Sequence, residues 1–433
     1  MTNPQIIPDE LLELRRAIDE IDKAILALVA ERRSCSQRVG EVKKNHQIAS
    51  LRDAAREYEI VTRLIHEGLS LGIPTTLTQA IFSALISDSL SRQEQDILRS
   101  TTPDGAVVRR QVGYMTRDGV WGEQAAASCA ALHKGIGDEN RSSIVRWETI
   151  TEALEALENE STDLLMLPLE HSTLGTLRES VIALTDSSLR IIRDIRVPVS
   201  LTLMAPAGVS LNQIRRIFGS DLAFRLCSSL LDTLSPITKE ISPTLDPEWL
   251  AAEGIRDNDW ALLAPEHVAI TSGLTVLATA VADVPTTTLR FIACSRTKEP
   301  INPQLSYATS LITVTSQQSG ALSAILEVFR RHNIVLTKLE SLGAEFAHYQ
   351  WGRQLPGRLR QGTAWIEQVK GRISDVSLSC DEFFLIECIG AETHPPLATA
   401  LAELSSIGSH PHVLGSYPRA SAPPEPGVIE DRR

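Results

Sequence analysis

One long stretch near the N-terminus constrains the fold more than any other part of the chain. From Asp9 to Lys44 there is no proline, and the only glycine is Gly40. Apolar residues recur in it at intervals of three and four, the spacing of one helix face. They are Leu11, Leu14, Ile18, Ile21, Ile25, Leu28 and Val29. A helix this long in a globular chain usually packs in a coiled-coil-like way against a partner, in the same chain or in another.

Three cations along this predicted helix cannot all face one small ligand. Arg32 and Lys43 are 11 residues apart, so they lie within about 20° of each other, three turns apart. Arg15 comes 17 residues before Arg32, which places it about 100° around the helix and about 25 Å along its axis. Two copies of the helix that cross each other can bring all three cations to one site.

Length and charge narrow the class of protein. A chain of 433 residues predicts two or three domains. Its net charge of −12 argues against a protein that binds nucleic acid or a membrane surface. No apolar run approaches the length of a membrane span, and the polar, acidic N-terminus does not resemble a signal peptide. The sequence therefore predicts a cytoplasmic protein.

Cysteine and histidine spacing points away from metal chemistry. The six cysteines include no CxxC pair, which favours reduced thiols in a cytoplasm. The histidines show no metal-ligand spacing either. We expect no metal and no cofactor.

The chain divides into three predicted domains and two connecting or terminal segments. An all-helical domain spans residues 1–97, with a second helix from about Asp53 to the glycines at 68–72 and a third opened by Pro74. Residues 98–110 lose the periodicity and read as a linker. The Pro-rich tail, 420–433, is predicted to be disordered.

Residues 111–297 alternate short apolar runs with helical patterns, which predicts a two-lobed α/β domain. Its predicted helices cover 122–133, 149–160 and 212–234. Residues 306–419 follow a βαββαβ order, an α+β unit interrupted by a Gly- and Arg-rich insertion at about 343–375.

The polar residues of the helical domain form a set on helix faces. Asp53, Arg56 and Glu57 share a face of the second helix, and Ser89 and Gln93 share a face of the third. Taken singly, each could belong to a solvated face. Taken with Arg15, Arg32 and Lys43, their order and spacing match a known family.

The segments LRRAIDEIDKAILALVAERR, VGEVKK, LRDAAREYEI and ISDSLSRQ resemble the all-helical class of chorismate mutases. The resemblance implies a homodimer in which two intertwined protomers share each active site. Arg15 would then reach in from the partner chain, and Arg32 and Lys43 would come from the same chain. It also implies the following roles. Lys43 and Gln93 donate to the breaking ether oxygen, Asp53 and Glu57 hold the substrate hydroxyl, Ser89 contacts a carboxylate, and Arg56 completes the face of the second helix.

The rest of the chain resembles the bifunctional chorismate mutase/prephenate dehydratase family, whose C-terminal ACT domain senses an amino acid. PLEHSTLGTL at 168–177 and TTLRFIAC at 287–294 resemble dehydratase motifs. The resemblance implies a second-domain site that includes Glu170, His171, Thr288 and Arg290. The landmarks of the third domain imply an effector site at Gly320, Ala321, Leu322, Glu340 and Ser341.

Several positions depart from the dehydratase motifs. The motif threonine is Leu289, and the adjacent Thr288 would point to the opposite face of a strand. The motif asparagine is His171, and a serine-histidine-proline segment corresponds to Gly219-Ser220-Asp221. The loss of several groups together predicts a relaxed or changed second activity. Arg290 has two open interpretations, an anion ligand or a surface arginine on an edge strand.

The effector motif departs as well, because Leu342 and Gly343 replace its arginine and proline. Four hypotheses follow for the chain: a chorismate mutase with degenerate second and third domains; an active bifunctional enzyme that makes phenylpyruvate; a second domain that performs another reaction on prephenate or an amino analogue; and a purely regulatory ligand-sensing chain. The complete mutase set favours an enzyme.

Overall fold

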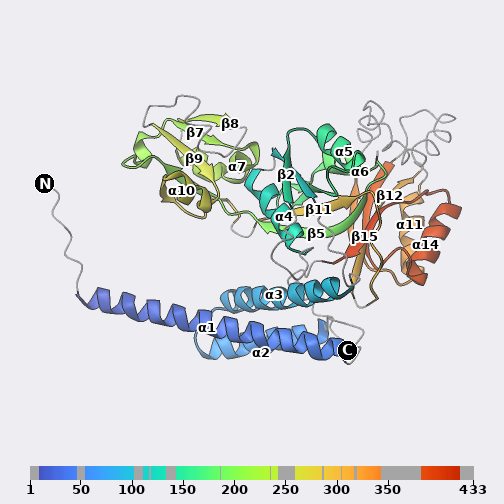
Figure 1. Cartoon of the computed structure of the whole chain (residues 1–433), viewed down its shortest axis with the longest axis horizontal. Coiled ribbons are helices and arrows are strands. Elements are labelled where there is room, and N and C mark those ends of the chain that lie inside the picture. The colour runs from blue at the N-terminus through green and yellow to red at the C-terminus, as the bar shows by residue number, and fades with distance from the viewer. Residues whose placement is uncertain are drawn as a thin grey trace. The chain divides into compact units, whose positions relative to one another are not determined.

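A computed structural model gives the structure of the protein, and Figure 1 shows its elements. The described residues are 9–45, 54–101, 111–116, 119–132, 143–185, 187–234, 236–241, 259–284, 287–303, 305–315, 319–342 and 382–419. They form two compact units. The first contains the N-terminal helices to Asp104, and the second contains Gly105–Ile301 and Tyr307–Ala420.

The helical unit consists of three helices, as predicted. They are α1 (Asp9–Asn45), α2 (Ala54–Ser70) and α3 (Thr75–Thr101). The helix α3 packs against both α1 and α2. One boundary differs from the prediction, because α3 continues through 98–101, the first residues assigned to the linker. The periodicity weakens there without a residue that ends a helix.

The apolar stripe of α1 is left uncovered in this unit. Leu14, Ile18, Ile21, Ile25 and Leu28 are between 52% and 64% exposed. Burying a side chain of this size stabilises a protein by roughly 1.5–3 kcal/mol relative to leaving it exposed. A stripe of five such residues on a 37-residue helix is therefore a strong candidate for a helix–helix contact.

The first sheet of the second unit is mixed and has the strand order β2-β1-β3-β11-β5, with β4 paired to β3. Its strands are β1 (Gln111–Met115), β2 (Ser143–Trp147), β3 (Leu164–His171), β4 (Gly175–Thr176), β5 (Arg190–Pro198) and β11 (Thr288–Ser295). Its helices are α4 (Gly119–Leu132), α5 (Ile150–Glu158) and α6 (Arg178–Thr185). The strands β3 and β11 lie in the interior, so both are nearly continuous apolar runs.

The second lobe is built on a sheet of order β10-β6-β9-β7-β8. Its strands are β6 (Thr202–Ala205), β7 (Arg216–Gly219), β8 (Thr238–Ile241), β9 (Trp260–Ala264) and β10 (Thr275–Ala278). Its helices are the short 3₁₀ element η2 (Leu211–Gln213), α7 (Asp221–Leu226), α8 (Ser228–Thr233) and α10 (Glu266–Ser272).

The single helix predicted over 212–234 is wrong. Residues 216–219 form the strand β7, with Ile217 and Phe218 buried between neighbouring strands. The hydroxyl of Ser220 then accepts a hydrogen bond from the backbone N–H of Ala223 and starts α7. The Ser-Asp pair was a helix-start signal inside the segment that the periodicity argument treated as continuous.

The last sheet has the antiparallel order β13-β14-β12-β15. Its elements are β12 (Tyr307–Thr315), α11 (Ala321–Arg331), β13 (Leu336–Ser341), β14 (Glu382–Ile389), α14 (Pro395–Ser406) and β15 (His412–Pro418). This is the predicted βαββαβ order, and α11 and α14 lie against each other beside the sheet. The insertion at 343–375 and the tail 420–433 lie outside the described residues.

The first and last sheets of the second unit share one core. Leu165, Leu167 and Ile292 from the first sheet pack in the same cluster as Ile312 and Leu385 from the last. The backbones of β5 and β15 also approach closely at Gly415, where an added Cβ would lie 2.3 Å from the carbonyl oxygen of Ile191. The α/β and βαββαβ parts therefore fold as one body.

Candidate functional site

The helices α1 and α3 bring Arg32 and Ser89 into contact. Arg32 donates from one terminal nitrogen to the carbonyl of Leu85 at 2.8 Å and to the hydroxyl of Ser89 at 3.0 Å. Burial lowers the pKa of Arg32 from its ordinary value, and the charge of Asp88 opposes that shift. The guanidinium is a cation at neutral pH in any case. Arg32 is thus a positioned, half-buried positive charge.

Arg33, which the sequence analysis did not single out, fastens the same crossing. It forms a two-point ion pair with Asp88 of α3, with N–O distances of 2.9 and 3.0 Å. This two-point contact links α1 to α3 one residue away from Arg32.

Gln93 is buried, and its amide nitrogen donates to the backbone carbonyl and the hydroxyl of Ser36 at 3.2 and 3.4 Å. Its amide oxygen is buried without a hydrogen-bond partner among the described residues. The only glycine of α1 explains how the amide fits, because a Cβ on Gly40 would lie 3.1 Å from Cγ of Gln93. Glycine weakens a helix interior by about 1 kcal/mol relative to alanine. Here it gives room to a buried amide.

The other predicted residues of this site lie outside the Arg32–Ser89 contact or outside the described residues. Lys43 is half-buried on α1, and Arg15 and Arg56 are exposed on α1 and α2. Glu57 lies in α2, but its side chain and Asp53 lie outside the described residues. Because α1 is one continuous helix, Arg15 stays about 25 Å from Arg32 along the axis. One chain therefore brings Arg32, Ser89 and Gln93 to the α1–α3 face and leaves Arg15 apart from them.

The predicted second-domain residues lie next to one another on β3 and β11 but face two sides of the sheet. His171 pairs with Leu289, and Glu170 pairs with Arg290. Directly opposed residues share a face and successive residues alternate. His171 and Leu289 therefore face the lobe with β7 and α7, while Glu170 and Arg290 face the βαββαβ sheet. Thr288, two residues before Arg290 on β11, shares the face of Arg290, so His171 is separated from the other three predicted residues.

His171 is fully buried and is held as a neutral imidazole. Its Nδ1 accepts hydrogen bonds from the backbone N–H groups of Thr173 and Leu174 at 3.2 and 3.1 Å. Burial, and then the charge of Arg225, lower the pKa of His171. An accepting Nδ1 places the proton of the neutral ring on Nε2. That Nε2 is buried without a partner among the described residues.

Arg290 is buried on an interior strand, so its interpretation as a surface arginine on an edge strand is wrong. It contacts Asp194 of β5 at 3.1 Å, Glu387 of β14 at 2.8 Å and Glu170 at 3.3 Å, and it donates to the hydroxyl of Tyr417 at 2.9 Å. Burial alone would lower the pKa of Arg290, but Tyr417, Asp194 and Glu387 raise it overall. The guanidinium is occupied by residues of this chain.

A second ionic chain extends from this cluster to β13. Lys338 pairs with Glu170 at 2.8 Å and with Glu340 at 3.4 Å, and Glu340 also accepts a hydrogen bond from Thr176. Burial raises the pKa of Glu170, but Lys338 and Arg290 together lower it below its ordinary value. Glu340, predicted for effector binding, therefore contacts the α/β part directly.

The other predicted effector residues have clear positions. Gly320 is the N-cap of α11, and Ala321 and Leu322 begin that helix. Ser341 ends β13 and is exposed, and Leu342 is fully buried where the family motif has an arginine.

The sequence analysis missed four residues of the ionic cluster: Asp194, Glu387, Tyr417 and Lys338. One signal was present, because a charged residue inside the apolar run RIIRDI indicates a buried ion pair.

Within the described part of the chain, Cys35, Cys129, Cys227, Cys294 and Cys388 are free thiols. Burial and the neighbouring Asp283 raise the pKa of Cys227 to about 12, so it is no nucleophile. None of the helices in the described residues is both long enough and apolar enough to cross a membrane.

Models of two protein families match the chain. The family described as chorismate mutase type II matches residues 14–94, and the family described as prephenate dehydratase matches residues 112–299. The bifunctional chorismate mutase/prephenate dehydratase of Enterobacter agglomerans is 25% identical over 423 residues, which are 97% of this chain and 99% of that relative.

Two solved structures share the fold of the second unit. A prephenate dehydratase from Arthrobacter aurescens, in complex with L-Phe, aligns with a TM-score of 0.52 at 24% identity and covers 73% of this chain and 92% of that chain. GqqA, described as a novel type of quorum quenching acylases, aligns with a TM-score of 0.50 at 22% identity and covers 71% of this chain and 98% of that chain. These two likenesses establish the fold and not the reaction.

Proposed function

This chain joins a chorismate mutase domain to a prephenate dehydratase domain in the manner of the bifunctional chorismate mutase/prephenate dehydratases, and from that premise we propose that its helical unit rearranges chorismate to prephenate. The observation that carries the proposal is the contact of Arg32 with Ser89 beside the buried amide of Gln93. A cation, a hydroxyl and an amide gathered at one helix crossing suit an anionic substrate that also has an ether oxygen.

The rearrangement is pericyclic, so no nucleophile and no proton transfer is required. In our proposal Arg32 and Ser89 bind one carboxylate, and Arg15 binds the other. Arg32 uses only one terminal nitrogen for its contacts with Leu85 and Ser89, which leaves donors of its five-donor guanidinium for substrate. Lys43 and the amide of Gln93 donate to the ether oxygen as negative charge develops on it, and the amide exchanges its weaker contact with Ser36 for the substrate. Asp53, Glu57 and Arg56 complete the site around the ring hydroxyl.

We propose a homodimer that shares its mutase sites. Arg15 cannot reach Arg32 along a continuous helix, and the uncovered stripe of α1 from Leu14 to Leu28 is suited to pack on a second copy. Crossing two copies would bury the stripe and carry Arg15 of one protomer towards Arg32 of the other. The charge and composition of the chain suit a cytoplasmic location for this dimer.

A second candidate function is dehydration of prephenate by the second unit. In favour of it, His171 offers a buried Nε2–H without a partner among the described residues, and such a group can donate to a leaving hydroxyl. Against it, Leu289 fills the position opposite His171 with a buried apolar side chain. We place the dehydratase second to the mutase for that reason.

We also propose that the βαββαβ part is an ACT-like domain that responds to an amino acid. Gly320, Ala321 and Leu322 at the start of α11, with Glu340 and Ser341 on β13, are the proposed effector residues. The contacts of Glu340 with Lys338 and Thr176 supply a physical route from that site to Glu170.

The test is to give the purified protein chorismate at neutral pH and to identify the products without an acid step, because acid alone converts prephenate to phenylpyruvate. We expect prephenate to accumulate in proportion to enzyme and to persist. Phenylpyruvate that forms in proportion to enzyme would establish the second candidate function, and a dihydroaromatic product would indicate another reaction on prephenate. Chorismate left unchanged would contradict the mutase proposal or point to an amino analogue as substrate.

A further inference from the structure

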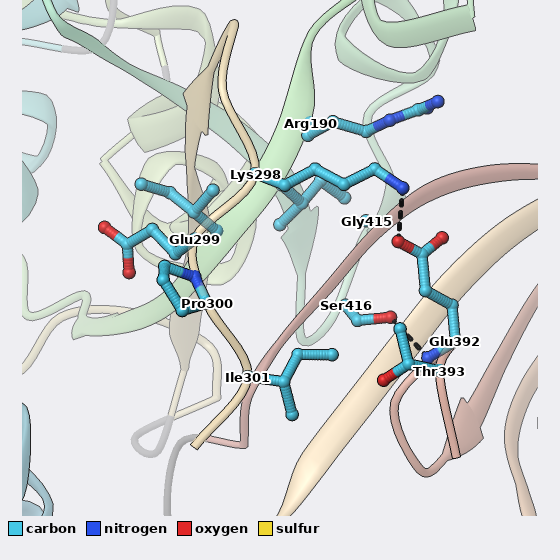
Figure 2. A pocket seen from close by; sticks show the side chains of 11 residues that line it. Arg190, Lys298, Glu299, Pro300, Ile301, Glu392, Thr393, Gly415 and Ser416 are labelled. Carbon is cyan, nitrogen blue, oxygen red and sulfur yellow. Dashed lines mark hydrogen bonds and ion pairs between the residues drawn. The ribbon is translucent and has the colours of Figure 1, made fainter. Parts of the chain in front are cut away.

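A cavity of about 250 Å³ lies inside the second unit, where the α/β and βαββαβ parts meet. Figure 2 shows it from close by. Its lining comes from the start of β5, from the segment after β11, from the turn after β14 and from β15. The volume is below the about 300–1,000 Å³ of pockets for drug-sized ligands. It suits a small metabolite.

The walls of this cavity are held in place by contacts of their own. Glu299 pairs with the buried Arg193 of β5 at 2.5 Å, which fixes the segment after β11. Ser416 accepts a hydrogen bond from the backbone N–H of Glu392 at 2.9 Å, which fixes the turn after β14. Gly415 lets the backbones of β5 and β15 approach closely at the floor. The cavity is therefore preformed.

The lining divides into an apolar part and a charged part. Pro300 and Ile301 supply the apolar part, while Ile191 and Ile192 of β5 also belong to the lining but have side chains buried in two different cores. In Figure 2, Arg190 and Lys298 extend towards the same side and the Lys298 ammonium meets the Glu392 carboxylate, whereas the carboxylate of Glu299 points away from that ammonium. Lys298 pairs with Glu392 at 2.5 Å. Two cations beside one carboxylate leave an excess of one positive charge.

Neither cation is fully used by its partner. Arg190 donates one terminal nitrogen to the carbonyl of Val413, and a guanidinium has five N–H donors. Lys298 is 58% exposed and has three donors, of which the pair with Glu392 uses one. Thr393 and Ser416 also belong to the lining, and the Ser416 hydroxyl is already bonded to Thr309 and to the backbone N–H of Glu392. An anion at this end would meet two cations and further polar groups.

We propose that this cavity binds a small organic carboxylate, with its carboxylate at Arg190 and Lys298 and its apolar body against Pro300 and Ile301. The site is separate from the mutase residues, which belong to the helical unit, and from Gly320 and Glu340. Because its lining comes from both parts of the second unit, a bound carboxylate stabilises their junction. The inference does not depend on the mutase proposal.

The test is calorimetric titration of the full-length protein with 3-phenylpropionate, which combines a carboxylate with an apolar body. We expect saturable binding, and no comparable binding of 2-phenylethylamine, which carries the opposite charge. Lys298→Met should weaken binding roughly tenfold or more, since it removes a charge-assisted hydrogen bond. Glu392→Gln should leave binding unchanged or tighten it, because it removes the carboxylate that pairs with Lys298 at the charged end.

Two control variants locate the site. Lys239→Met makes the same change of charge on the exposed strand β8 and should bind as wild type. Arg32→Ala should also bind as wild type, which excludes the mutase site as the source of the heat. Equal affinity of the Lys298→Met variant and wild type, the absence of saturable binding, or equal binding of the amine would overturn the proposal.

Discussion

Arg32→Ala is expected to lower kcat for chorismate by roughly a hundredfold to a thousandfold, the range for loss of one preorganised donor. Arg32 is held by Leu85 and Ser89 at 2.8 and 3.0 Å, so its remaining donors are already oriented when substrate arrives. Alanine removes both the charge and this orientation. Steady-state turnover of chorismate measures the effect.

Two companion variants make the Arg32 result specific. Arg32→Lys keeps the charge but loses the planar fork, so it should recover only a small part of the activity. Arg63→Ala removes an exposed arginine from α2 that pairs with Glu67, and it should turn over chorismate as wild type does. Helical circular dichroism should be the same for all three variants. Near-normal turnover by a folded Arg32→Ala protein would show that the site is misassigned.

Arg290→Met is expected to destabilise the second unit by about 3–5 kcal/mol, the usual cost of breaking a buried ion pair by removing one partner. Arg290 lies among Asp194, Glu387 and Glu170, and the side chains of the first two are 8% exposed. Without the guanidinium, Asp194 and Glu387 lose their ion-pair partner while still buried, whereas Glu170 keeps its pair with Lys338. Chemical denaturation of the full chain, followed by the fluorescence of its tryptophans, measures the change in free energy of unfolding.

The matched control is Arg330→Met. Arg330 pairs with Glu327 on the surface of α11, where its side chain is 73% exposed, and such exposed pairs contribute little to stability. Adding Glu387→Gln to Arg290→Met should recover part of the loss, because one unpaired charge disappears. A loss below about 1 kcal/mol for Arg290→Met alone would contradict the view that these buried ion pairs depend on Arg290.

Periodicity alone was sufficient to predict the three N-terminal helices and the βαββαβ order, because each of these elements carries its own apolar pattern. The prediction of one helix over 212–234 failed because the apolar residues of a short buried strand and two short helices together follow a helix-like spacing. Only the cap at Ser220 separates them, and a local hydrogen bond is weak evidence against a long apolar pattern.

The surroundings of the site residues were harder to predict than the residues themselves. The partners of Arg290 come from β3, β5, β14 and β15, and strand order is not encoded in local spacing. Once the register pairs Arg290 with Glu170 and Leu289 with His171, alternation sends the two pairs to opposite faces. The role of Gly40 could not be predicted from local sequence either, because the side chain that needs the space, Gln93, lies on another helix.

The shared mutase site is tested most directly by mixed dimers of two inactive variants. Arg15→Ala and Arg32→Ala chains, coexpressed with different tags and purified as mixed dimers, should contain one intact site and one doubly damaged site. We predict about half the wild-type activity per mixed dimer, while each variant alone is nearly inactive. Mixed dimers as inactive as their parents would contradict a site built from Arg15 of one protomer and Arg32 of its partner.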